Sequence, residues 1–203
     1  RYTPISDQVN SKELRTILEY LELSLNKNPK GSIVELGCYV GTTSLMISRY
    51  LNETYRFNSF HVYDSFVGLP QKSKEDESPV GINFVKGELN ASKKSFINNY
   101  RKANLRLPVI HKGWFRDITS AEVPSNIAFA FLDSDYYDSI MDSLNLISSK
   151  LYKGSVVIVD DYQSESLPGA KKATDDWLSF NTSHKLIRVE NSLAIICDDR
   201  ATD

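Results

Sequence analysis

The sequence predicts an α/β fold in which about seven strands form a mostly parallel sheet with helices on both faces. Two observations lead to this fold class. Short apolar runs rich in Val, Ile and Phe alternate with helical patterns along most of the chain. The last two strand-like runs are separated by only a short polar turn, which predicts an antiparallel hairpin at one edge of the sheet. The 203 residues suffice for one large core, so we expect residues 1–203 to form a single domain.

Composition and charge are those of an ordinary globular protein. Apolar residues make up 41% of the chain, charged residues 25%, and the net charge is −2. Without a strong basic face, no nucleic-acid partner is expected. No apolar run reaches about 18 residues and no signal-peptide pattern is present, so we expect a cytoplasmic protein without a membrane anchor, although the chain opens on Arg1. Cys38 and Cys197 form no Cys-x-x-Cys motif and are expected to be free thiols.

The first half of the chain reads as a helical segment followed by strand–helix units. Ser11 offers an N-cap, and Leu and Ile then recur at helical spacing. Residues 71–83 are polar and without periodicity, so we expect a solvated loop that can act as a lid. The expected elements are a helix over 11–30 within an N-terminal helical cover (1–31), a strand at 32–36, a helix around 45–51, a strand at 60–64 and a helix at 92–103.

The second half continues the alternation and ends in the hairpin. Gly154 is expected to break a helix before the next strand, and Pro168 suits the first turn of another helix. The expected elements are strands at 108–111 and 127–132, a helix at 138–151, a strand at 155–159, a helix at 168–178, and strands at 184–189 and 193–197. The three histidines lack the spacing of a metal site and are interpreted as structural.

Four aspartates follow two of the most apolar strands. Asp133 and Asp135 come after the run 127–132, and Asp160 and Asp161 come after the run 155–159. Ligands bind at the carboxyl ends of strands in open parallel sheets, so these carboxylates are expected to converge. Their mutual repulsion calls for a cation, and Mg²⁺ with oxygen ligands is the simplest candidate. The alternative is that the acids only end strands and cap helices. Asp135 in particular could cap the helix that begins near Tyr136.

A glycine turn follows the first strand. Gly37 and Gly41 allow a tight passage from strand to helix, and the following helix would direct its N–H groups at a ligand. Their spacing is Gly-x-x-x-Gly and does not match the dinucleotide pattern Gly-x-Gly-x-x-Gly. Glu35 lies within the strand and must bind something to offset its burial. The alternative reading is a tight turn without a ligand.

Two further features indicate a nucleoside-containing cofactor. Asp64 ends the second strand, where an acid commonly holds the ribose hydroxyls. Trp114, beside Gly113 at the end of the third strand, could stack on the adenine, although a core Trp explains it equally well. The sequence has the acid of the dinucleotide-binding pattern and lacks its glycine spacing. Adenosylmethionine is therefore as good a candidate for the cofactor as NAD.

Five motifs, taken together and in this order, resemble the macrocin O-methyltransferase family of adenosylmethionine-dependent enzymes. The resemblance covers about residues 33–177. The motifs are Glu35-Leu-Gly37-x-x-x-Gly41, Asp64-Ser-Phe-x-Gly-Leu-Pro70, Gly113-Trp-Phe115-x-Asp117, Leu132-Asp-x-Asp135-x-Tyr137 and Val159-Asp-Asp-Tyr162. The family includes sugar O-methyltransferases of macrolide and aminocoumarin pathways.

The resemblance implies a Rossmann-like class I methyltransferase fold and a role for each candidate residue. Asp133, Asp160 and Asp161 would bind Mg²⁺, Asp135 would be the general base, and Asp135 and Asp133 form the predicted catalytic pair. Glu35 and Gly37 would contact the methionine part of adenosylmethionine, Asp64 and Ser65 the ribose, and Trp114 the adenine side. The full predicted cofactor-binding set is Glu35, Gly37, Tyr39, Gly41, Thr42, Ser44, Asp64, Ser65, Gly113, Trp114 and Asp133.

The resulting hypothesis is a Mg²⁺-dependent O-methyltransferase that acts on a hydroxyl of a small polar acceptor, a sugar or glycoside. The alternatives are a methyltransferase for catechol-like phenols, a non-catalytic adenosylmethionine-binding module and an NAD-dependent oxidoreductase. Asp160-Asp161 departs from the Asp-Asn ending of the catechol enzymes, which favours sugars. The turn residues Cys38-Tyr39-Val40 and a short N-terminal region depart from the antibiotic enzymes, so the acceptor is left open, as is assembly into a homo-oligomer.

Overall fold

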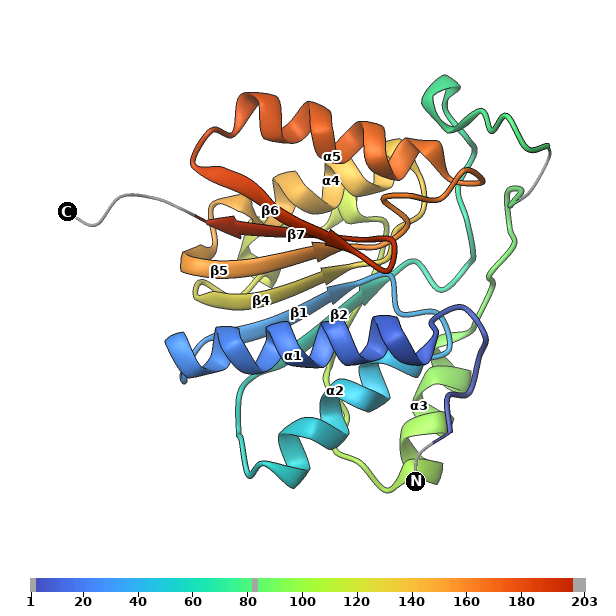
Figure 1. Ribbon diagram of the computed structural model, residues 1–203. Coiled ribbons are helices and arrows are strands. Elements are labelled where there is room, and N and C mark those ends of the chain that lie inside the picture. Colours follow the sequence, from blue (N-terminus) through green and yellow to red (C-terminus); the bar gives the residue numbers. More distant parts are fainter. Residues whose placement is uncertain (1–2, 82–83, 199–203) are drawn as a thin grey trace.

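The computed structural model describes residues 3–81 and 84–198, and its strands form one seven-stranded sheet (Figure 1). The spatial order is β3-β2-β1-β4-β5-β7-β6. Neighbouring strands are parallel except at β7, which is antiparallel to both β5 and β6. The strands are β1 (Ser32–Leu36), β2 (Phe60–Asp64), β3 (Val109–Lys112), β4 (Ile127–Leu132), β5 (Leu151–Val159), β6 (His184–Glu190) and β7 (Leu193–Asp198). The predicted sheet and its antiparallel hairpin are confirmed.

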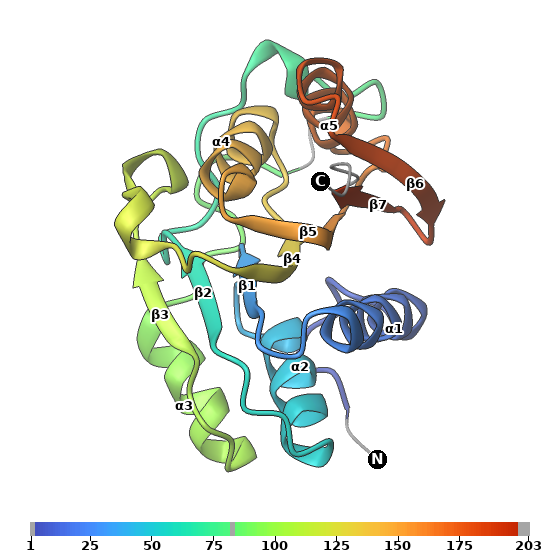
Figure 2. The ribbon, with the colours of Figure 1, turned by 90° about the vertical axis from the view of Figure 1, so that its left-hand side faces the viewer.

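Five α-helices cover the two faces of the sheet. Figure 2 shows α1, α2 and α3 on one face and α4 and α5 on the other. The helices are α1 (Ser11–Lys27), α2 (Thr42–Glu53), α3 (Lys93–Ala103), α4 (Tyr137–Ser148) and α5 (Pro168–Phe180). Three short 3₁₀ helices, η1 (Lys74–Asp76), η2 (Phe115–Asp117) and η3 (Ser120–Glu122), lie in the connections.

Side-chain alternation along the strands divides the core into two layers. Phe129 and Phe131 of β4 pack with α1, α2 and α3, whereas Ala130 and Leu132 pack with α4 and α5. This is the period of two expected for a strand that is buried on both faces, and all six residues of β4 are buried. Trp177, 1% exposed, is the largest side chain in the layer under α5.

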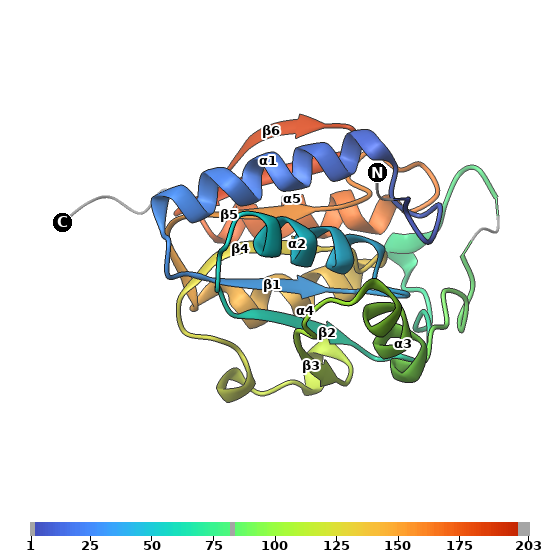
Figure 3. The ribbon, with the colours of Figure 1, turned by 90° about the horizontal axis from the view of Figure 1, so that it is seen from below.

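The order of the strands determines where a site can form. β1 lies between β2 and β4. The chain leaves β1 through α2 on one face of the sheet and leaves β4 through α4 on the other face, which opens a crevice at the carboxyl ends of these two strands. Figure 3 shows the segment before α1 and the long connection after β2 at this same end of the sheet. Segments that are far apart in sequence therefore surround the strand ends that carry the acids.

Several predicted boundaries were wrong: the first helix ends at Lys27 and not at residue 30, α4 ends at Ser148 and not at residue 151, and β5 begins at Leu151 and not at residue 155. Two local signals were also misread. The N-cap of α1 is Asn10 rather than Ser11, because the Asn10 side chain accepts the N–H groups of Lys12 and Glu13 while Glu13 accepts the Asn10 N–H. Gly154 does not separate α4 from β5. Instead it lies within β5 at φ 80°, where the pairing with β4 changes register.

The connection after β2 is not simply the solvated loop that its composition predicts. Within 71–83, of which 82 and 83 lie outside the described residues, η1 places Asp76 at 1% exposure. The Asp76 carboxylate accepts the N–H of Tyr137, the first residue of α4, at 2.7 Å. The helix that Asp135 was considered to cap is therefore capped by Asp76, from a loop 61 residues earlier.

Two further expectations were that the cysteines form no disulfide and that no helix spans a membrane. Cys38 is buried, Cys197 is half-buried, and the two form no disulfide bond. In the part of the chain that the structure describes, none of the helices has the length and apolar character needed to cross a membrane.

Candidate active site

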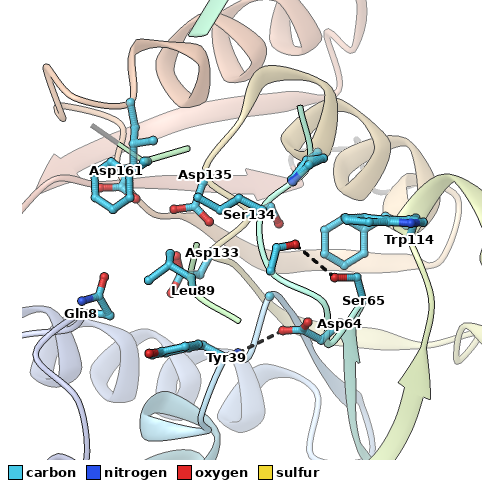
Figure 4. A pocket seen from close by; sticks show the side chains of 18 of the residues that line it. Gln8, Tyr39, Asp64, Ser65, Leu89, Trp114, Asp133, Ser134, Asp135 and Asp161 are labelled. Atoms are coloured by element: carbon cyan, nitrogen blue, oxygen red, sulfur yellow. Dashed lines mark hydrogen bonds between the residues drawn. The ribbon is translucent and has the colours of Figure 1, made fainter. Parts of the chain in front are cut away.

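Three aspartates converge at the ends of β4 and β5. Asp133, Asp135 and Asp161 each place one carboxylate oxygen within 4.8 Å of the others. Asp135 and Asp161 adopt left-handed backbone conformations, at φ 60° and 59°, which turn the chain sharply just past each strand. Figure 4 shows the three carboxylates on one side of a pocket.

The fourth aspartate lies differently. Asp160 is 6% exposed, and its carboxylate accepts the N–H of Asp161 at 2.8 Å. The structure therefore groups Asp135, and not Asp160, with Asp133 and Asp161. Direct metal ligation by Asp160 stays a prediction. The geometry favours Asp135 over Asp160 as the third ligand.

The acids raise one another's pKa. Burial, then the charges of Asp135 and Asp161, raises the pKa of Asp133 well above its ordinary value. Burial, then the charges of Asp161 and Asp160, does the same to the pKa of Asp135. Burial and the charge of Glu13 raise the pKa of Asp161 to about 6. The cluster therefore holds unfavourable negative charge that a cation would stabilise.

The donor set fits a hard divalent cation. Three carboxylate oxygens around one centre are the kind of ligand that Mg²⁺ prefers, with further positions left for water or an acceptor. Neither cysteine nor histidine belongs to this group, which argues against a softer metal such as Zn²⁺.

The glycine turn connects β1 directly to the acidic strand. Gly37 has φ 90°, and a side chain there would place Cβ 1.8 Å from the backbone oxygen of Asp133. The close approach expected of Gly37 is thus made to β4 itself. Any side chain at this position would push β1 and the start of the Asp133 segment apart.

Asp64 holds the same turn from the other side. Its carboxylate accepts the N–H groups of Cys38 and Tyr39 at 2.9 and 3.0 Å, and that of Phe66 at 2.7 Å. A carboxylate offers about four acceptor positions, so room remains for a further hydrogen bond from a ligand hydroxyl. Asp64 remains partly exposed toward the pocket.

One continuous pocket joins these features. Figure 4 shows Trp114 and Ser65 on the side opposite Asp133, Asp135 and Asp161, with Asp64 below Ser65 and Tyr39 below Asp133. Of the predicted cofactor-binding residues, seven line the pocket, namely Gly37, Tyr39, Asp64, Ser65, Gly113, Trp114 and Asp133. The predicted nucleoside features and the acidic cluster are thus brought together in one cavity.

The other predicted cofactor residues do not line the pocket. Glu35 is 1% exposed and accepts a hydrogen bond from the Ser44 hydroxyl, and burial raises its pKa to about 8. Gly41 faces the ring of Phe96, and the Thr42 hydroxyl is hydrogen-bonded to that of Ser6 at 2.6 Å. Contacts of these residues with a cofactor stay predictions that no observed geometry supports.

Several residues that line the pocket could not be identified as site residues from their local sequence. Asp7 and Gln8 lie in the irregular segment before α1, and the Ser6 hydroxyl ties this segment to α2. Phe84 and Leu89 come from the connection after β2. Neither segment has a periodic pattern, so only tertiary contacts bring their side chains to the site.

Two motif tyrosines fasten the acidic segments to α5. The Tyr137 hydroxyl donates to Asp176 at 2.9 Å, and the Tyr162 hydroxyl donates to Asp175 at 2.6 Å. Tyr137 lies two residues after Asp135, and Tyr162 directly follows Asp161. The tyrosines thus support the positions of two of the three clustered carboxylates.

Comparison with known proteins identifies the family to which this chain is similar. The family described as macrocin-O-methyltransferase matches residues 7–194. The demethyldecarbamoylnovobiocin O-methyltransferase of Streptomyces niveus is 26% identical over 189 residues, covering 90% of this chain and 71% of that protein. The solved structure of the O-methyltransferase NovP is 25% identical with a TM-score of 0.75, covering 92% of this chain and 79% of that one.

A second relative is similar over a shorter stretch. The 8-demethyl-8-(2,3-dimethoxy-alpha-L-rhamnosyl)-tetracenomycin-C 4'-O-methyltransferase of Streptomyces olivaceus is 26% identical over 162 residues. The match covers 76% of this chain and 61% of that protein, so the chain spans less than two thirds of this relative's length.

Proposed function

Because this chain belongs to the macrocin O-methyltransferase family and is an adenosylmethionine-dependent O-methyltransferase, we propose that it methylates a hydroxyl of a sugar or glycoside with the help of Mg²⁺. The name of one relative supports the acceptor class directly, because it is a 4'-O-methyltransferase of a tetracenomycin that carries a rhamnosyl group. The other relative is named for O-methylation of demethyldecarbamoylnovobiocin.

The proposal that the enzyme uses Mg²⁺ rests on the grouping of the Asp133, Asp135 and Asp161 carboxylates. These three residues would hold the ion, which would supply positive charge to bring an acceptor hydroxyl closer to ionisation. Positive charge at this place would also keep the three carboxylates ionised despite their burial. Asp160 lies behind them and would act through its hydrogen bond to the Asp161 N–H.

The opposite side of the pocket suits the methyl donor. Gly37, Tyr39, Asp64, Ser65 and Trp114 would hold adenosylmethionine, which would supply an activated methyl group. Asp64 offers its remaining acceptor positions to hydroxyls, and the ring of Trp114 offers an aromatic face. Because these residues share one cavity with the acids, a donor and an acceptor bound there would lie next to each other.

The proton of the acceptor hydroxyl needs a base. Asp135 contributes one carboxylate oxygen to the cluster and lines the pocket, so its second oxygen would accept that proton while the first holds the ion. Asp133 and Asp161 orient the hydroxyl by fixing the centre around which it binds. The protein's contribution is mainly positioning, since these carboxylates are held by the strand ends and by the two motif tyrosines.

Metal binding tests the proposal most directly. Mn²⁺ can be titrated into the wild type and into Asp133→Asn, Asp135→Asn, Asp160→Asn and Asp161→Asn, with calorimetry as the readout. We expect the largest losses of affinity at Asp133, Asp135 and Asp161, and a smaller loss at Asp160. Asp138→Asn, an exposed acid of α4 outside the cluster, is the matched control.

Methyl transfer is measured on the same variants with a rhamnoside and with a catechol as acceptors. Transfer to the rhamnoside that depends on the metal and is lost in Asp133→Asn is the expected result. The proposal fails if the wild type binds no divalent cation, or if it methylates the catechol and not the sugar.

A further inference from the structure

The glycine turn between β1 and α2 contains three residues in left-handed backbone conformations. They are Gly37 at φ 90°, Tyr39 at φ 45° and Gly41 at φ 94°. Glycine adopts such a conformation freely, whereas a tyrosine adopts it only where the surrounding structure holds it. Tyr39 is also the bulky side chain that this turn contributes to the pocket (Figure 4). The shape of the pocket beside the turn therefore depends on what holds the backbone around Tyr39.

Two side chains from outside the turn bond to the backbone on either side of Tyr39. The Asp64 carboxylate accepts the N–H groups of Cys38 and Tyr39, at 2.9 and 3.0 Å. The Asn99 side-chain amide donates to the carbonyl of Val40 at 2.9 Å, from α3 and across 59 residues of sequence. Together these hydrogen bonds fix the peptide units before and after Tyr39.

Asn99 lies on the face of α3 that packs against the turn. Phe96, one turn earlier on the helix, is fully buried, and a Cβ on Gly41 would lie 2.9 Å from its ring. The Tyr100 hydroxyl is hydrogen-bonded to that of Ser48 of α2 at 2.9 Å. Packed neighbours on both sides of Asn99 therefore hold its amide in place.

We propose that Asn99 is a positioning residue for adenosylmethionine, although it does not itself line the pocket. Its hydrogen bond to Val40 keeps Tyr39 in the left-handed conformation that shapes the methyl-donor side of the pocket. A ligand that binds one of several conformations loses affinity in proportion to the time that the protein spends in the others. The inference rests on the proposed placement of the methyl donor against Gly37, Tyr39 and Asp64.

Asn99→Asp tests the inference with almost no change of shape, because it replaces the amide donor with an oxygen that repels the Val40 carbonyl. Without the anchor, the turn should spend only a minor part of its time in the binding conformation. The Kd for adenosylhomocysteine, measured by calorimetry, and the KM for adenosylmethionine should each rise about five- to tenfold. At saturating adenosylmethionine kcat should stay within about twofold of the wild type. The Kd for Mn²⁺ should be unchanged, because the acidic cluster is held at the ends of β4 and β5.

Two more variants separate positioning from charge and from folding. Asn99→Ala removes the donor without adding repulsion and should raise the same two constants by a smaller factor. Asn98→Asp is the matched control, since it makes the same change one position earlier on α3, where the side chain accepts a hydrogen bond from Arg101 of the same helix at 3.5 Å. This control should leave both constants at their wild-type values. Thermal unfolding of each variant ensures that binding is measured on folded protein.

The outcomes separate this inference from the proposed function. Wild-type constants in both Asn99 variants, with adenosylhomocysteine binding weakened in Asp64→Asn, would overturn the role of Asn99 and leave the proposed donor site intact. Equal losses of Mn²⁺ and adenosylhomocysteine affinity would also overturn it, since Asn99 would then support the fold as a whole. If the wild type does not bind adenosylhomocysteine, or if Asp64→Asn binds it as tightly as the wild type, the proposed donor site fails and this inference fails with it.

Discussion

Replacing Asp76 with alanine should destabilise the protein and lower kcat, although Asp76 is outside the pocket lining. The Asp76 carboxylate caps α4 by accepting the Tyr137 N–H at 2.7 Å, and it also accepts the N–H and hydroxyl of Ser73 at 2.9 and 2.7 Å. The residue is 1% exposed. Asp135, the proposed base, lies two residues before Tyr137 in a left-handed backbone conformation. The cap therefore helps to hold the turn that aims this base.

The magnitude follows from these contacts. Loss of an N-cap costs about 1 kcal/mol and up to about 2, and a buried N–H left without an acceptor costs about 1–3 kcal/mol. The two figures describe largely the same hydrogen bond, so we expect a loss of about 2 kcal/mol, or roughly 4–8 °C in Tm for a chain of this size. A shift of about 1 Å at a catalytic group can cost about 100-fold in rate, so kcat should fall by roughly 10- to 100-fold.

The assays are thermal unfolding and initial rates with adenosylmethionine and a rhamnoside. Asp76→Asn keeps an oxygen acceptor for Tyr137 but replaces the oxygen that accepts the Ser73 N–H, so it should recover most of the loss in kcat and only part of the loss in stability. Gly169→Ala should reproduce the defect with Asp76 intact, because its Cβ would lie 1.8 Å from the Asp76 carboxylate oxygen. Glu77→Ala removes the same charge from an exposed position of the same loop and should change little.

The reasoning is refuted if Asp76→Ala keeps the wild-type Tm and kcat. It is also refuted if Glu77→Ala produces the same loss, since the effect would then come from the charge of the loop and not from the cap.

Three further predictions concern other buried groups. Burial raises the pKa of Glu35 from 4.5 to about 8, so the folded state keeps a proton that the unfolded chain releases, and stability should fall as pH rises from about 5 to 8, by on the order of 3 kcal/mol. Urea unfolding at both pH values should show this slope in the wild type and its loss in Glu35→Gln. His61 and His111 are hydrogen-bonded to each other at 3.0 Å, and burial lowers the pKa of both below 6.5, so stability should fall as pH drops through 6.5. Urea unfolding of the double variant His61→Gln, His111→Gln should lack this acid-side loss, and an unchanged loss would show that other groups cause it. Finally, Tyr162→Phe removes the hydroxyl that donates to Asp175, which should cost about 1 kcal/mol. It should also weaken Mn²⁺ binding at the adjacent Asp161, and calorimetry that finds wild-type affinity would show that the tether has no role in the site.

The sequence was sufficient for the elements whose burial is uniform. β4 was predicted at its observed bounds because a run of six apolar residues between polar neighbours can be satisfied only as a strand covered on both faces. β1 and β2 were also predicted at their observed bounds, although both contain polar residues and are buried less uniformly. At β5, where Gly154 introduces an irregularity, local pattern was misleading, since glycine breaks a helix and is also accepted at a strand bulge.

The grouping of the four acids shows the limit more sharply. Asp135 and Asp161 both have left-handed backbone conformations just past the ends of β4 and β5, and these turns bring their carboxylates together with that of Asp133. The Asp160 carboxylate instead accepts the N–H of Asp161 and does not belong to this group. The family resemblance implied Asp133, Asp160 and Asp161 as the metal ligands, and nothing in the local sequence distinguishes Asp160 from Asp135 for this role.

By itself, the sequence determined the order of strands and helices, the convergence of acids at the strand ends and the glycine turn that faces them. These features depend on local periodicity and on short stretches of chain. Only the tertiary structure decided which three carboxylates share one centre, that Asp76 caps α4 from a distant loop, and that Asp7 and Gln8 complete the pocket. These contacts join segments tens of residues apart, and their geometry depends on how the helices and loops pack against the sheet.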